Sequence, residues 1–82
     1  MRVKAVLFAV LAERLGVREE WLELPAGATA GDVLAHYRAR LSAAGSILLA
    51  VNAEFRPPEA PLNEGDEVAL GPPGHPLLEG GP

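Results

Sequence analysis

The chain has no cysteine, and this absence limits how it can be stabilised. Disulfides and thiolate metal sites are excluded in a chain of 82 residues, which is near the small end of what folds without such cross-links. Stability must therefore come from a hydrophobic core, and hydrophobic residues make up 49% of the sequence. We expect one small domain.

Positive charge is also scarce, with seven Lys and Arg against eleven Asp and Glu and a formal net charge of −4. Binding to nucleic acid needs a basic stripe that displaces counterions, so no nucleic-acid partner is expected. The apolar N-terminal stretch is interrupted by charges at Lys4 and Glu13, and it is too short to span a bilayer. It also lacks a small-residue cleavage site. We expect a cytoplasmic protein without a membrane partner.

Motifs for catalysis are missing as well. The glycines follow neither the phosphate-loop nor the dinucleotide pattern. His36 and His75 lie far apart in the chain, and Ser42 and Ser46 have no evident base beside them. The carboxylates of Glu64, Asp66 and Glu67 cluster at an expected turn, where solvated side chains are commoner than an acid–base pair. The residues themselves therefore indicate no metal, no cofactor and no active site.

Periodicity and turn residues predict a small two-layer α+β domain. Thr29 and Asp32 resemble a capping box, and the helix that follows ends at Gly45, with Trp21 and Tyr37 expected in the core or at its edge. One helical turn at 11–15 is closed by Gly16. The expected strands are residues 3–10 with both faces covered, 18–24 half-exposed, 47–51, 54–55 after a tight turn at Asn52-Ala53, and 67–70.

The composition changes after Leu70, since four of the last twelve residues are proline and four are glycine. We expect a folded domain over residues 1–71 and a mobile, extended tail over residues 72–82. The tail ends in Gly80-Gly81-Pro82.

Three stretches resemble the ubiquitin-like β-grasp sulfur carriers, most closely the small subunit of molybdopterin synthase. "VLFAVLAERLG" (6–16) is similar to the first strand and following turn of that family, and "LLAVNAEF" (48–55) to its third strand and Val-Asn turn. "PLNEGDEVALGPP" (61–73) is the most specific, because it combines Pro-Leu, Gly-Asp-Glu-Val and a proline pair. The resemblance spans nearly the whole chain.

The resemblance implies a β-grasp fold and a carrier without its own active site. In that family an E1-like enzyme uses ATP to adenylate the C-terminal glycine, which is then converted to a thiocarboxylate. The large subunit of molybdopterin synthase uses this sulfur to build the dithiolene of the molybdenum cofactor. By resemblance, Gly81 carries the sulfur and Gly80 provides clearance beside it, while Pro72 and Pro73 stiffen the exit from the fold.

The chain departs from this family at three points. Gly71 stands where the family has an aromatic residue, residues 74–79 lengthen the tail, and Pro82 follows the glycines. Because a peptide bond to Pro82 blocks the carboxylate of Gly81, Pro82 must be removed, or the chain is part of a longer one, or the tail is not a carrier. Sulfur carriage for thiamine or tRNA thiolation, a ubiquitin-like modifier and a β-grasp interaction module without carrier chemistry remain alternatives.

Overall fold

The computed structural model describes residues 1–38, 40 and 47–72. Its elements in chain order are β1 (Arg2–Leu7), α1 (Val10–Leu15), β2 (Glu19–Glu23), α2 (Ala30–Arg38), β3 (Leu48–Val51), β4 (Glu54–Phe55) and β5 (Glu67–Gly71). The expected strands and the short first helix are thus confirmed, each within a few residues of its predicted bounds.

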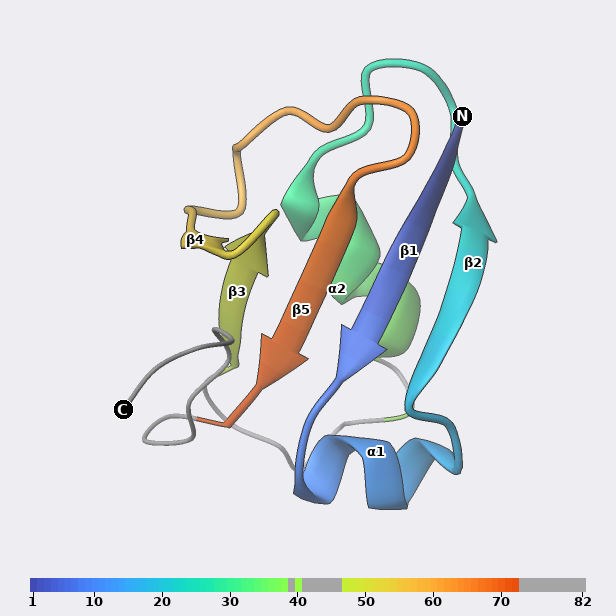
Figure 1. Ribbon diagram of the computed structural model, residues 1–82, viewed down its shortest axis with the longest axis vertical. Helices are drawn as coiled ribbons and strands as arrows, with labels where there is room; N and C mark the ends of the chain where they lie inside the picture. The colour runs from blue at the N-terminus through green and yellow to red at the C-terminus, as the bar shows by residue number, and fades with distance from the viewer. Residues whose placement is uncertain (39, 41–46, 73–82) are drawn as a thin grey trace.

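The five strands form one mixed sheet in the order β2-β1-β5-β3-β4, and α2 lies across one face of it (Figure 1). β1 and β5 are parallel and pair from Lys4↔Glu67 to Leu7↔Leu70. The other neighbouring strands are antiparallel. The last strand, β5, therefore lies at the centre of the sheet between β1 and β3.

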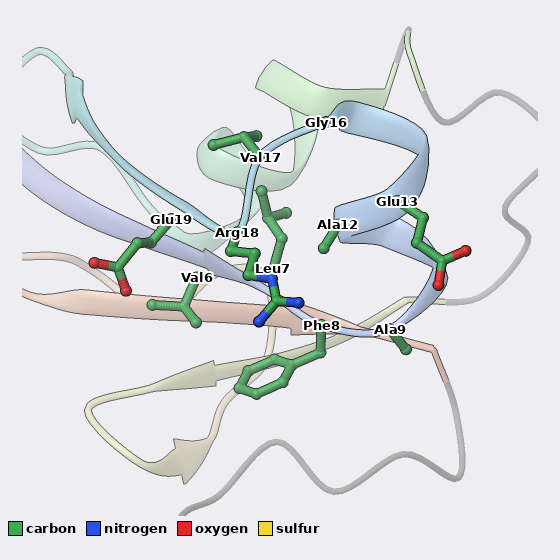
Figure 2. Close-up of a pocket in the computed structure, with 10 residues that line it drawn as sticks. All are labelled: Val6, Leu7, Phe8, Ala9, Ala12, Glu13, Gly16, Val17, Arg18 and Glu19. Carbon is green, nitrogen blue, oxygen red and sulfur yellow. The ribbon is translucent and has the colours of Figure 1, made fainter.

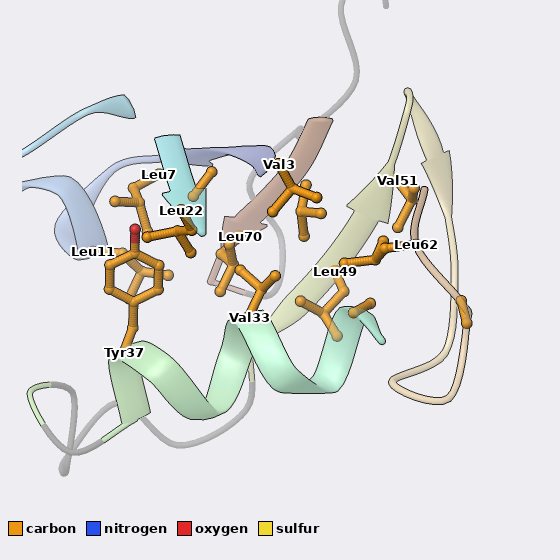
Figure 3. Packing of buried hydrophobic residues seen from close by; sticks show 14 residues of the cluster. Val3, Leu7, Leu11, Leu22, Val33, Tyr37, Leu49, Val51, Leu62 and Leu70 are labelled. Carbon is orange, nitrogen blue, oxygen red and sulfur yellow. The ribbon is translucent and has the colours of Figure 1, made fainter. Parts of the chain in front are cut away.

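The core lies between α2 and the sheet face that α2 covers (Figure 3). Alternate residues of β1, namely Val3, Ala5 and Leu7, are almost fully buried there. Val33 and Tyr37 of α2 face them with no exposed surface. This alternation follows from the period of two along a strand, which sends successive side chains to opposite faces.

Local signals in the sequence fix where the helices begin and end. Gly16 closes α1 in the left-handed conformation at φ 72°, and its N–H donates to the carbonyl of Ala12 at 2.9 Å. At the start of α2 the Asp32 carboxylate accepts a hydrogen bond of 2.8 Å from the backbone N–H of Thr29. The capping-box prediction is therefore confirmed. α-Helical geometry extends to Arg38, and the predicted continuation over 41–44 lies outside the described residues.

Two expectations about burial were wrong. Arg2, Lys4 and Val6 of β1 face away from α2 and are exposed or half-buried, so this strand is fully covered on one face only. Trp21 is 51% exposed on the same uncovered side, where the Arg2 guanidinium stacks 4.9 Å from its ring centroid. The apolar run of β1 indicated burial on both faces, but a sheet with a single crossing helix leaves its second face uncovered.

No helix in the described parts of the chain is long and apolar enough to cross a membrane.

Candidate functional site

The tail begins at the end of the central strand. Gly71, the last residue of β5, pairs with Leu48 of β3, and the half-buried Pro72 follows it. The N–H of Phe8 donates to the carbonyl of Leu70 at 3.0 Å, which brings the end of β1 beside the same point. Of the predicted site residues, Pro72 is the one that the structure describes. Pro73, Gly80 and Gly81, with Pro82, lie outside the described residues.

The sheet face away from α2, which we term the open face, is apolar around this exit. The pairings Val6↔Ala69, Ala69↔Ala50 and Ala50↔Phe55 place four apolar residues in one row across four strands. Val6, Phe8 and Leu48 pack against the buried Ala50 and Ala69. Phe55 ends the row with 55% of its surface exposed. The accessible apolar surface of this face is therefore that of Phe55 and of the half-buried Val6, Phe8 and Leu48, and exposed apolar groups gathered in this way are typical of a protein-docking surface.

A hollow of about 570 Å³ borders the open face between β1, α1 and β2 (Figure 2). Its apolar lining includes Val6, Phe8, Ala12 and Val17. Figure 2 shows the Arg18 side chain extending into the hollow above Phe8. The residues that line it include no Ser, Thr or His, and so they offer no nucleophile with a base.

The clustered carboxylates at the turn before β5 have structural roles. Glu64 accepts a hydrogen bond from the backbone N–H of Arg2 at 2.9 Å. Asp66 accepts one from the backbone N–H of Asn63 at 2.8 Å and a second from the side-chain amide of Asn52 at 2.9 Å. These contacts tie the turn to the β3–β4 hairpin and to β1, in agreement with the structural interpretation of the cluster.

The remaining candidates do not converge on a site. His36 is exposed on α2, while His75, Ser42 and Ser46 lie outside the described residues. Within residues 1–38, 40 and 47–72, no three His, Asp or Glu side chains are grouped closely enough to hold a metal ion. Tyr37 is a core residue as expected, and its hydroxyl donates to Glu20 Oε2 at 2.5 Å.

Sequence reasoning missed the apolar cluster of the open face. Leu48 lies in β3, Phe55 in β4 and Phe8 directly after β1, and only the sheet pairing brings these three residues together. Phe55 alone carried a usable signal, since a large aromatic side chain beside a tight turn has little chance of burial.

Comparison with known proteins matches this architecture to one family. The ThiS family model matches residues 5–74. The molybdopterin synthase sulfur carrier subunit of Chlamydomonas reinhardtii is 38% identical in an alignment 79 residues long, which covers 89% of this chain and 95% of that protein.

Two solved structures share the fold closely. One, from Pyrococcus furiosus, is described as a candidate molybdopterin converting factor, subunit 1; it has a TM-score of 0.80 at 28% identity, over 89% of this chain and 98% of that one. The other, SAMP1 from Haloferax volcanii, has a TM-score of 0.79 at 28% identity, over 99% and 100%.

These matches confirm the expected β-grasp fold and the resemblance to molybdopterin synthase small subunits. The residues that the family model matches include the central strand β5, and the algal relative covers 89% of the chain. The chain belongs to the ThiS family.

Proposed function

We propose that the chain is the sulfur carrier subunit of a molybdopterin synthase. One observation carries this proposal: the 38% identity to an algal protein of that name extends over 95% of the relative's length. The apolar side chains gathered on the open face beside the end of β5 also support it, because a carrier needs a surface on which its partner enzymes dock. In this proposal the chemistry takes place at the C-terminal tail, on those enzymes.

The proposed reacting group is the carboxylate of Gly81. An E1-like partner would join it to AMP from ATP, with release of pyrophosphate. Sulfide-level sulfur from a sulfur donor would then attack the acyl carbon and displace AMP, which gives the thiocarboxylate. A C-terminus that enters two different enzyme pockets needs a narrow backbone, and glycine without a Cβ provides it at positions 80 and 81. Proline has a restricted φ, so Pro72 and Pro73 reduce the conformational entropy that is lost when the tail docks. Pro82 must be removed before activation.

The open face is the proposed binding surface for both partners, the E1-like enzyme and the large subunit. Its apolar row adjoins Gly71 and Pro72, so a partner that covers Val6, Leu48 and Phe55 also lies beside the start of the tail. Apolar side chains at the centre of a patch contribute most of the binding free energy in protein interfaces. We assign the same face to the large subunit of molybdopterin synthase and to the E1-like enzyme, which would bind it in turn.

Copurification with a molybdopterin synthase large subunit tests the proposed partner. The wild-type chain and a Phe55→Ala variant should both fold, because Phe55 is largely exposed, but the variant should bind about ten-fold or more weakly. Glu59→Ala, another exposed residue on the loop after β4, is the matched control and should bind as the wild type does. If the wild-type chain does not bind the large subunit but copurifies with a different sulfur acceptor, the assignment to molybdopterin synthesis is wrong.

The similarity to SAMP1, described as a small archaeal modifier protein, favours a second candidate function. In that case the adenylated Gly81 would be joined to amines of other proteins. Incubation with an E1-like partner and ATP separates the two functions. A carrier gains sulfur when a sulfur donor is present, whereas a modifier forms covalent conjugates with lysine-containing proteins.

We also propose that residues 1–71 fold as the β-grasp domain, that residues 72–82 act as its tail, and that the protein works in the cytoplasm. Among the described residues, the buried hydrophobic core runs from Val3 to Leu70, and this supports the first part of the proposal.

A further inference from the structure

The chain is almost free of primary amines. Of its seven Lys and Arg residues, Lys4 is the only lysine. A lysine amine becomes a nucleophile when it loses its proton, whereas the guanidinium of arginine stays protonated in proteins. Six of the seven cationic side chains are therefore inert toward an activated acyl group.

Lys4 itself is held against the sheet. It lies on the open face, and its Nζ is 3.3 Å from Glu19 Oε1 on the neighbouring strand β2. Its side chain is 30% exposed, although lysine is normally among the most exposed residue types. The Lys4 amine is thus paired with a carboxylate, and most of the lysine side chain is covered.

The α-amine of Met1 is held in a similar way. It donates a hydrogen bond of 2.6 Å to the carbonyl of Leu24 and lies 3.2 Å from Glu23 Oε2. Glu19 and Glu23 both belong to β2 and lie on the open-face side of this edge strand. Strand β2 therefore supplies the carboxylates that pair with both the Lys4 amine and the Met1 α-amine.

We propose that this arrangement protects the carrier from acylating itself. The inference rests on the proposed function, because it concerns the period in which Gly81 is an activated ester. In the reaction that is avoided, a neutral amine attacks the Gly81 carbonyl carbon and a C–N bond forms. The C–O bond to AMP breaks, AMP leaves, and the amine proton passes to solvent. The product is an amide between two copies, or a closed chain, and its sulfur-carrying end is lost.

A chain ending at Gly81 as an alkyl thioester tests the proposal without any partner enzyme. The thioester is prepared by intein cleavage and incubated alone at mildly alkaline pH, and products are followed by intact mass and peptide mapping. Arg14→Lys adds an amine on the exposed side of α1 and is the reference for an unprotected lysine. Glu19→Gln removes the partner of Lys4, and Lys4→Arg leaves the α-amine as the one primary amine.

The wild-type thioester should hydrolyse to the acid, while Arg14→Lys should form amide-linked dimers at least about five-fold faster than the wild type. Glu19→Gln should raise the yield of amide at Lys4 by up to about five-fold, as expected for loss of an exposed ion pair. Hydroxylamine should cleave every variant at one rate, which shows that the thioesters are equally reactive. Amide formation at Lys4 of the wild type, or at Met1 of Lys4→Arg, as fast as in Arg14→Lys would overturn the proposal.

The outcome is independent of the test of function. A chain that no E1-like enzyme activates refutes the proposed function, yet its thioester still reports on the amines. A wild-type thioester that acylates itself refutes the protection and leaves carrier activity open.

Discussion

Tyr37 is the residue whose side chain has the most altered proton affinity. Burial raises the pKa of its phenol well above the ordinary value, and the hydrogen bond to the Glu20 carboxylate raises it further. In the unfolded chain the phenol titrates near pH ~10. Above that pH the unfolded chain loses a proton that the folded chain keeps. The contribution to stability is therefore complete below pH ~10 and falls as the pH rises further.

An alkaline titration checks this effect, and Tyr37 is the only tyrosine, so phenolate absorbance reports on it alone. The free energy of unfolding of the wild type should fall above pH ~10, and phenolate should appear only as the chain unfolds. Tyr37→Phe should be less sensitive to pH in this range and about 1–2 kcal/mol less stable at neutral pH, because Glu20 loses its donor. Phenolate absorbance near pH ~10 in a chain that is still folded would contradict this account.

The sequence predicted that Tyr37 is buried, but it did not predict that Trp21 is exposed. Tyr37 lies on the same face of α2 as Ala30 and Val33, and the apolar face of an amphipathic helix packs against the core. Trp21 lies on the edge strand β2, which begins and ends with glutamates. The sequence of this strand shows which side chains share a face, but it does not show which face is covered. Which face is covered depends on where α2 crosses, and that is decided by contacts distant in sequence.

The β3–β4 hairpin carries strain at its turn. Asn52 and Ala53 have φ values of 50° and 66°, which a two-residue turn between twisted strands requires. Asparagine adopts this left-handed conformation at little cost. The side-chain oxygen of Asn52 also accepts a hydrogen bond of 3.0 Å from the backbone N–H of Glu67. Alanine has no such compensation, because its Cβ crowds the following carbonyl oxygen.

Replacing Ala53 by glycine should therefore stabilise the protein by about 0.5–1 kcal/mol, since relief of strain exceeds the extra entropy of the unfolded chain. The measurement is urea unfolding. Ala35→Gly, on the exposed side of α2, is the matched control and should destabilise by about 1 kcal/mol. Equal losses in both variants would show that the turn is not strained.

At the level of elements, sequence reasoning succeeded where a boundary has a local cause. Gly16, the Thr29–Asp32 cap and the Asn52-Ala53 turn each predicted an observed start, end or turn. It was less successful with β1, where composition could not show that one face stays open. It also could not place Phe8, Leu48 and Phe55 on one surface, because strand order is not encoded locally.

The central strand β5 ends at Gly71 with both of its neighbouring strands paired, and we propose that the folded domain ends there. If the proposed division is right, a chain truncated after Pro72 should unfold at the same urea concentration as the full chain and with the same m-value, because it keeps every buried core residue of the described part. A lower midpoint would mean that residues 73–82 belong to the folded unit, against the proposed division at residue 71.

Changing Gly81 to alanine in a chain that ends at this position should separate folding from transfer. Stability should be unchanged, because the proposed division places this residue in the tail, whereas sulfur transfer should fall by about ten-fold or more if the partner pocket has no room for a Cβ. The readout is the rate at which the large subunit consumes the thiocarboxylate. Equal rates for both chains would show that glycine is not required there.

The intact mass of the chain tests the central claim most directly. A preparation that ends at Gly81 is incubated with an E1-like enzyme, ATP and a sulfur donor, with omission of ATP as the control. The carrier function predicts a gain in mass equal to one sulfur in place of one oxygen, located at Gly81, and no gain without ATP. A mass that stays unchanged, with an E1-like enzyme shown to activate another carrier, would contradict the account.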